Sequence, residues 1–162
     1  GHRDRVCAVT ICPDGQLVSG SEDHTICVWQ SSAPQLLRTA QGHNGALTVL
    51  AFSRDAGTLV SAADDGVAHV WSTSAWKLIQ TFRHRHWVVS AALSADGRQL
   101  VTADAHEPPC AFLIWDVSTG KKLHTVVGPS GWIWALAISG DARTVASSSN
   151  GDSCVNTWSM AS

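Results

Sequence analysis

The sequence predicts an all-β protein built from four consecutive copies of one small antiparallel sheet, and three observations support this. Four tryptophans recur at intervals of 42, 44 and 43 residues, at Trp29, Trp71, Trp115 and Trp158. Short segments rich in Val, Ile, Leu and Trp alternate with turn sequences such as D-G and S-T-G. No segment of helical length has an apolar period near 3.6 residues, which disfavours a helical repeat.

Each copy contains four segments that fit β-strands, always in the same order. An apolar segment and a turn come first, as in residues 50–57 (LAFSRDAG). Two strands joined by a short turn follow, and residues 16–29 (QLVSGSEDHTICVW) align closely with residues 58–71 (TLVSAADDGVAHVW). A last strand comes after the tryptophan, as in residues 76–82 (WKLIQTF). The four copies are expected at residues 1–41, 42–82, 83–127 and 128–162.

Several of these strands are uncharged on both faces, for example residues 25–29 (TICVW) and 111–115 (AFLIW). Strands of this kind are covered on both sides. We therefore expect each sheet to pack between two others, which agrees with a content of 44% apolar and only 15% charged residues.

Composition also restricts where the protein acts. A net charge of -2 gives no strong attraction to nucleic acid or to a membrane surface. The longest apolar runs, such as residues 133–138 (IWALAI), are far shorter than the roughly 20 residues of a spanning helix, and residues 1–5 (GHRDR) are not a secretory start. Five cysteines without a C-x-x-C pair fit a reducing compartment. We expect a soluble intracellular protein, cytoplasmic or nuclear.

These residues resemble the WD-repeat (WD40) family, whose repeats carry a G-H pair and a later W-D pair. Gly1-His2 and Gly42-His43 match the first pair, and residues 115–128 (WDVSTGKKLHTVVG) resemble the closing half of a repeat. The resemblance covers the whole chain. It implies a WD40-type β-propeller with four blades of four-stranded antiparallel sheet, the last blade lacking its outer strand.

The resemblance also implies a hydrogen-bonded set of histidine, hydroxyl, aspartate and tryptophan within each blade. The matching positions are His2, Ser19, Asp23 and Trp29, then His43, Ser61, Asp65 and Trp71, then His84, Thr102 and Trp115, and finally Asp152 and Trp158. In the third copy Pro109 stands at the spacing of the aspartate, and Asp104 or His106 substitutes only if the inserted loop bends back. The fourth copy lacks the histidine.

Four blades are too few for the ring of about seven that this family usually forms, and an open arc leaves sheet edges and faces uncovered. Two arrangements solve this. Either the chain is part of a longer WD-repeat protein whose remaining blades complete the ring, or it forms a homodimer with eight blades.

The chain carries no pattern that points to catalysis or to metal. Its histidines and cysteines are not at zinc-finger spacing, and the G-x-S-x-G, H-E-x-x-H, P-loop and G-x-G-x-x-G motifs are absent. The His, Ser and Asp residues that recur together do so once per copy, as in a scaffold. We expect no enzyme activity, no cofactor and no metal.

The resemblance places the G-H turns and the aspartate turns on one face, which commonly binds peptides or partner domains. That face would display Arg3, Arg5, Glu22, Asp64, Arg85, His86, Trp87, His106, Glu107 and Trp132. Because Arg and Trp often anchor interfaces, the sharpest hypothesis is a contact cluster of Arg85, His86, Trp87 and Trp132. In the alternative, both indoles fill space between the third and fourth blades.

The leading functional hypothesis is therefore a non-catalytic scaffold that binds other proteins through blade loops. A nucleic-acid-binding propeller is a second hypothesis, disfavoured because its basic residues are spread over several blades and offset by acids. They are Arg3, Arg5, Arg83, Arg85, Lys121 and Lys122. A propeller enzyme would need a polar site unique to one blade.

Overall fold

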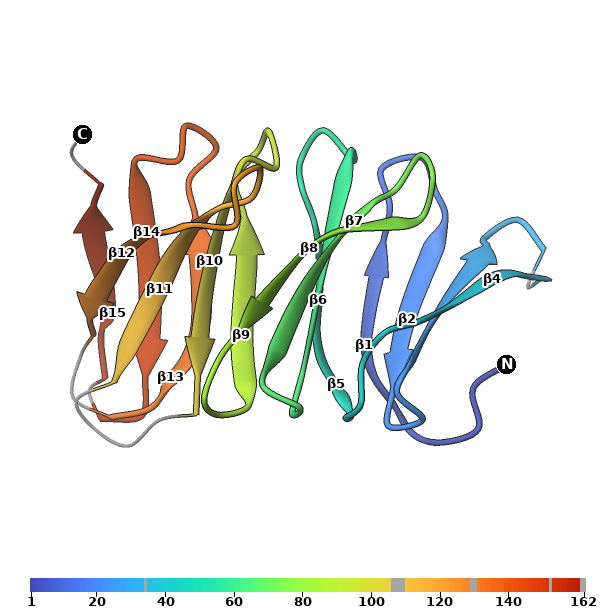
Figure 1. Cartoon of the computed structure of the whole chain (residues 1–162), viewed down its shortest axis with the longest axis horizontal. Coiled ribbons are helices and arrows are strands. Elements are labelled where there is room, and N and C mark those ends of the chain that lie inside the picture. Colours follow the sequence, from blue (N-terminus) through green and yellow to red (C-terminus); the bar gives the residue numbers. More distant parts are fainter. Residues whose placement is uncertain (34, 106–109, 129–130, 152, 161–162) are drawn as a thin grey trace.

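The computed structural model describes residues 1–33, 35–105, 110–128, 131–151 and 153–160 and confirms the all-β prediction. Within these residues fifteen strands form four antiparallel sheets that stand in a row (Figure 1). The described residues include no helix, and therefore none that could cross a membrane.

Each sheet is a meander in which every strand pairs with the next strand along the chain. The first sheet contains β1 (Val6–Ile11), β2 (Leu17–Ser21), β3 (Thr25–Gln30) and β4 (Gln35–Gln41), and the second contains β5 (Leu47–Phe52), β6 (Thr58–Ala63), β7 (Val67–Ser72) and β8 (Lys77–Arg83). The third contains β9 (Val88–Leu93), β10 (Gln99–Asp104), β11 (Ala111–Asp116) and β12 (Lys122–Val127). The fourth has three strands in the described residues, β13 (Ile133–Ile138), β14 (Thr144–Ser149) and β15 (Val155–Ser159).

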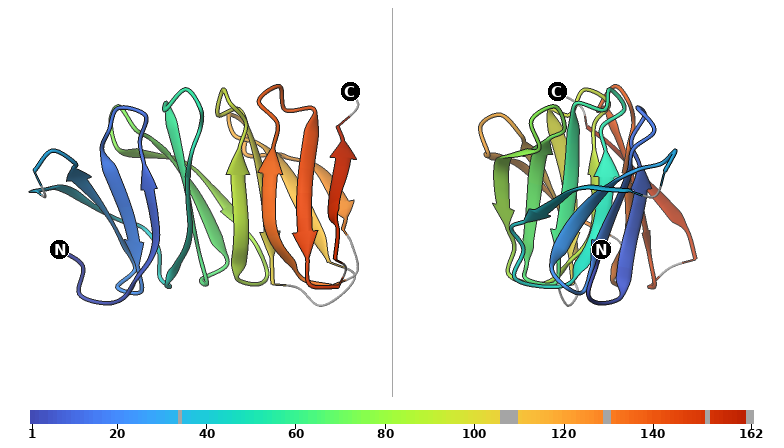
Figure 2. Two further views of the ribbon diagram at one scale, coloured as in Figure 1. Left: turned by 180° about the vertical axis from the view of Figure 1, so that it is seen from behind. Right: turned by 90° about the vertical axis from the view of Figure 1, so that its right-hand side faces the viewer.

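Successive sheets pack face to face, and their first strands β1, β5, β9 and β13 lie side by side (Figure 2, left). One apolar core lies between each pair of neighbouring sheets. Leu47 and Leu59 are in the first core, Phe82 and Leu100 in the second, and Ile133 in the third, and all five are almost completely buried. The middle strands β6, β7 and β10 of the two inner sheets are covered on both faces, as their uncharged sequences predict.

Local sequence explains how tightly the first two sheets approach. Gly20 of β2 faces β5 so closely that an added Cβ would lie 2.8 Å from Leu47 Cβ.

In the turn before the third strand, His24 of the first sheet and Gly66 of the second occupy the same position, with φ of 67° and 75°. This left-handed conformation suits the last residue of a three-residue hairpin loop, here residues 22–24 and 64–66.

Candidate functional site

In the first two sheets, the histidine of the G-H turn lies at the centre of a hydrogen-bonded network. His43 Nδ1 lies 3.2 Å from Asp65 Oδ2, and His43 Nε2 lies 2.8 Å from the Ser61 hydroxyl. The same hydroxyl accepts the indole N–H of Trp71 at 2.8 Å. Around His2 the corresponding distances are 3.1, 2.7 and 2.8 Å, to Asp23, to Ser19 and from Trp29 to Ser19. Polar groups that sheet packing would otherwise bury unpaired therefore have partners.

The second sheet contains a further buried imidazole, His69, which the sequence hypotheses did not include. Its ring centroid lies 4.5 Å from that of His43, and its nitrogens lie 3.0 Å from the Thr81 hydroxyl and 3.1 Å from the Gly42 carbonyl. Burial, and then the neighbouring His69, lowers the pKa of His43 to about 4, and burial also lowers the pKa of His69. At neutral pH His43 is therefore uncharged, so its Nδ1–H donates to Asp65 and its Nε2 accepts from the serine hydroxyl.

Asp23 in the first sheet is held as a carboxylate. Burial alone would raise the pKa of Asp23, but hydrogen bonds from the Thr25 hydroxyl, from the backbone N–H groups of Arg3 and Thr25, and from His2 outweigh it. The pKa of Asp23 is accordingly well below its usual range. The charged carboxylate fixes the G-H turn to the turn between β2 and β3.

The third network is less complete, as the missing aspartate predicts, but Asp104 takes part in it. Asp104 Oδ2 lies 3.5 Å from His84 Nδ1, and Trp115 donates to the Thr102 hydroxyl at 2.8 Å. Neither ring nitrogen of His84 has a hydrogen-bond partner among the described residues, although both are buried. Pro109 and His106 lie outside the described residues.

In the fourth sheet, the Trp158 indole donates to the buried Ser147 hydroxyl at 3.0 Å. Ser147 was not among the predicted hydroxyls, although TVAS at residues 144–147 aligns with TLVS at residues 58–61. Asp152, the predicted aspartate of this sheet, lies outside the described residues.

The residues predicted to bind partners fall into separate groups. Arg3 and Arg5 precede β1, and Arg5 forms an ion pair with Glu22, which lies in the turn between β2 and β3. Asp64 lies in the corresponding turn of the second sheet, between β6 and β7. A second group flanks the third and fourth sheets, and it consists of Arg85, His86 and Trp87 before β9 and Trp132 before β13. His106 and Glu107 lie outside the described residues.

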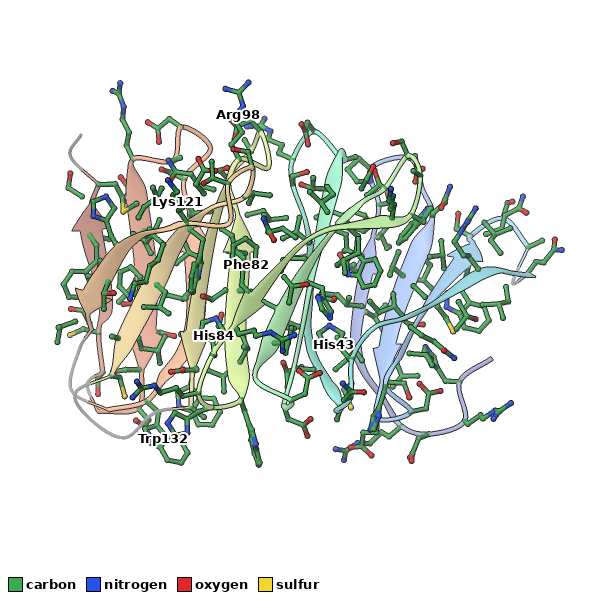
Figure 3. All side chains as sticks on the ribbon, in the orientation of Figure 1. His43, Phe82, His84, Arg98, Lys121 and Trp132 are labelled. Atoms are coloured by element: carbon green, nitrogen blue, oxygen red, sulfur yellow. The ribbon has the colours of Figure 1, made fainter. Side chains whose placement is uncertain are left out.

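Three tryptophans gather at the end of the third and fourth sheets where β9 and β13 begin, which we call the loop end. Trp87, Trp132 and Trp134 line a hollow of about 360 Å³ together with His86, Val89 and Ala105. Their exposed fractions are 61%, 47% and 60%, which favours the contact cluster over the alternative in which Trp87 and Trp132 fill the space between two sheets. Figure 3 shows Trp132 at this end, with Arg98 and Lys121 at the opposite end. We call the hollow the tryptophan hollow.

The internal repeat shows that the fold itself does not require these indoles. The residue just before the first strand of each sheet is, in order, Arg5, Ala46, Trp87 and Trp132. The second residue of that strand is, in order, Cys7, Thr48, Val89 and Trp134. Arginine, alanine, cysteine and threonine satisfy the same backbone positions in the first two sheets. The tryptophans are therefore a local feature of the third and fourth sheets.

A second, smaller hollow of about 200 Å³ shares one lining residue, His86, with the first. Arg85, Asp104, Ala111 and Leu113 complete its lining. Arg85 is exposed and has no ion-pair partner within the described part of the chain, whereas Arg98 pairs with Asp96.

The two ends of the row expose apolar side chains at positions that are core elsewhere. Val6, the first residue of β1, is 46% exposed, whereas its equivalents Leu47, Val88 and Ile133 are 2% exposed or less. At the other end, Val155 of β15 is 71% exposed, whereas the equivalent residues Ile26, Ala68 and Phe112 are buried. Both outer faces therefore have the composition of faces that pack against another sheet. We call them the end faces.

Within the residues that the structure describes, no three His, Cys, Asp or Glu side chains come together as metal ligands would. The basic side chains are also divided between the two ends of the sheets, since Arg85 precedes Trp87 at the end with Trp132, whereas Arg98 and Lys121 lie at the opposite end (Figure 3).

Comparison with known proteins extends these observations. Nuclear distribution protein PAC1 of Arthroderma otae is 29% identical over 172 residues, covering 98% of this chain and 36% of that protein. Nuclear distribution protein nudF of Emericella nidulans is 33% identical over 168 residues, covering 99% of this chain and 37% of that protein. The chain thus spans little more than a third of the length of these relatives.

Solved structures show the same fold. The crystal structure of the computationally designed Ika4 protein matches with a TM-score of 0.84 and 28% identity, over 99% of this chain and 94% of that chain. A chain of the mitotic checkpoint complex matches with a TM-score of 0.82 and 22% identity, over 99% of this chain and 52% of that chain, a likeness of fold alone.

A family model described as WD domain, G-beta repeat matches residues 1–30, 34–72 and 120–159. The unmatched residues 73–119 include most of the third sheet, where the aspartate of the network is displaced. Since the matched ranges make up more than half of the sequence, the four sheets are WD40 blades and the chain belongs to the WD40 family.

Proposed function

We propose that the chain is a non-catalytic protein–protein interaction scaffold within a larger intracellular WD-repeat protein, and that it binds a partner at the loop end of its third and fourth blades. The observation that carries the proposal is the tryptophan hollow. Three large indoles remain about half exposed or more at positions where the first two blades use smaller or polar side chains. Tryptophan and arginine are enriched among residues that dominate binding energy.

The networks around His2 and His43 favour a structural role over catalysis. Each resembles a nucleophile, base and acid in composition, but the Ser61 hydroxyl is completely buried and is bonded to both an imidazole and an indole. A nucleophile must reach its substrate. The same set of residues also occurs in two successive blades, which supports a role in holding each blade together.

The end faces support a second kind of partner. We propose that they pack against further blades of the same protein, in agreement with the greater length of the relatives, and the alternative is a second copy of this chain. The described cysteines form no disulfide bond with one another, and Cys12 and Cys27 are buried, which supports an intracellular site of action, cytoplasmic or nuclear.

Site-specific photo-crosslinking tests the proposed function. A benzoylphenylalanine at position 132 should crosslink to a discrete protein in extracts of the source cells, and the same group at position 98 should not. Trp87→Ala should remove the product obtained from position 132. The proposal is refuted if the two positions give the same products, or if Trp87→Ala leaves the product unchanged.

A further inference from the structure

We propose that the tryptophan hollow and the hollow beside Arg85 form one site for a peptide segment of a partner protein, in which a large apolar side chain is followed by acidic side chains. The apolar side chain would enter among Trp87, Trp132 and Trp134, and an acidic side chain would pair with Arg85. This inference rests on the proposed function and specifies the chemistry of the partner.

The size and lining of the tryptophan hollow fit a side chain better than a whole cofactor. Its volume of about 360 Å³ lies at the low end of the roughly 300–1,000 Å³ typical of small-molecule sites, and its wall is formed mainly by three indoles, Val89 and Ala105. Covering indoles that are now about half exposed or more removes a large apolar area from water. A large apolar side chain therefore gains most at this position.

The three indoles also retain polar groups for a peptide backbone. The N–H groups of Trp29, Trp71, Trp115 and Trp158 each donate to a hydroxyl inside their own blade. Within the described residues, the indole N–H groups of Trp87, Trp132 and Trp134 have no hydrogen-bond acceptor, although the backbone N–H of Trp132 donates to Asn150 Oδ1 at 2.7 Å. Carbonyl oxygens of an extended peptide can accept them, which adds orientation to apolar burial.

Charge selects an acidic rather than a basic neighbour for the apolar side chain. Arg85 lines the second hollow and lacks an ion-pair partner in the described ranges, whereas Arg5 is paired with Glu22. Asp104, in the same hollow, is directed toward His84, with 3.5 Å between carboxylate and ring nitrogen. A cationic side chain would gain attraction from the indole faces but would approach the Arg85 guanidinium. An acidic side chain pairs with that guanidinium directly.

Indole signals in a ¹H–¹⁵N spectrum of the full chain provide the test. The probe is the blocked peptide acetyl-Gly-Ser-Phe-Glu-Glu-Gly-Ser-amide, and the controls replace its Phe by Ala or both Glu by Lys. We expect the Phe-Glu-Glu peptide to shift the signals of Trp87, Trp132 and Trp134 saturably, while the four indoles inside the blades stay unchanged. Both control peptides should bind more weakly by on the order of tenfold.

Matched variants test whether Arg85 is the charged side chain that pairs with the peptide. Arg85→Glu should weaken binding of the Phe-Glu-Glu peptide on the order of tenfold and abolish its advantage in affinity over the lysine peptide. Arg98→Glu, at the opposite end of the blades, should change neither. Equal or tighter binding of the lysine peptide, or an unchanged preference in Arg85→Glu, overturns the assignment.

The outcomes separate this inference from the proposed function. If no peptide shifts the three indoles while crosslinking at position 132 still depends on Trp87, the partner chemistry is wrong and the scaffold function stands. If crosslinking fails as well, both proposals are wrong.

Discussion

Lowering the pH from about 7 to about 5 should destabilise the folded chain through His43. This imidazole is buried in the second blade beside His69, and its two ring nitrogens lie within hydrogen-bond distance of Asp65 and Ser61. Burial, followed by the proximity of His69, lowers the pKa of His43 to about 4. The same side chain in the unfolded chain takes up a proton near pH 6.5.

The magnitude follows from the two pKa values. Because the folded value is the lower one, the stabilisation is complete above about pH 6.5 and is lost as the pH falls toward 4. At about pH 5 the free energy of unfolding decreases by about 2 kcal/mol, and the full loss below about pH 4 is about 3 kcal/mol. His69 acts in the same direction, since its pKa is also lowered. Asp23 acts at lower pH, because its own pKa is depressed below the usual carboxyl range.

Urea unfolding of the chain at several pH values between about 4.5 and 7.5 measures this loss. His43→Gln should lower stability at pH 7 but flatten its dependence on pH between 5 and 6.5. His124→Gln, which changes an exposed histidine of β12, should leave the dependence intact. His69→Leu, which copies Leu113 at the equivalent position of the third blade, gives a second test because it removes the neighbouring imidazole. An unchanged pH dependence in both His43→Gln and His69→Leu would refute the reasoning.

Three further substitutions test the packing. Trp71→Ala removes a buried indole and should cost about 3–5 kcal/mol in the free energy of unfolding. Gly20→Ala, whose Cβ would lie 2.8 Å from the neighbouring blade, should cost about 1–3 kcal/mol in urea unfolding, and an unaffected midpoint would contradict the close approach. Ser61→Ala leaves two buried groups without partners and should cost about 1–3 kcal/mol, measurably more than Ser147→Ala, which affects only the half-buried Trp158. Equal losses from the two serine variants would contradict the difference between their networks.

Much of the fold follows from periodicity. The tryptophan spacing and the turn residues between short apolar segments indicate four antiparallel sheets, and the uncharged strands indicate that the sheets stack. The arrangement around His2 and His43 also follows from spacing, because Asp23 and Asp65 stand at equal distances before their tryptophans. Where the two strands are joined by the same short turn, equal spacing gives equal geometry.

The features of the candidate site that the sequence did not predict involve residues and connections that differ from one repeat to the next. The longer connection after β10 makes spacing uninformative, so the sequence left Asp104 and His106 as alternatives, and only the structure shows Asp104 approaching His84. The position of His69 is occupied by Cys27, Leu113 and Asn156 in the other blades, so it carries no repeat signal. Trp134 lies inside an apolar strand, and its exposure depends on which way that strand faces. Ser147 is different, since aligning the strand starts would have identified it.

The account depends most on a difference between two surfaces. The end faces have the composition of faces that pack against another blade, whereas the tryptophan hollow does not have that composition. Sedimentation velocity of the chain tests this difference. The account predicts species heavier than 17.2 kDa that shift toward monomer in Val9→Asp and are unaffected by Trp132→Ala. Val9 is a 59% exposed residue of β1 on the first end face, three positions after Val6. A stable 17.2 kDa monomer at all concentrations, or association that Trp132→Ala abolishes and Val9→Asp does not, would contradict it.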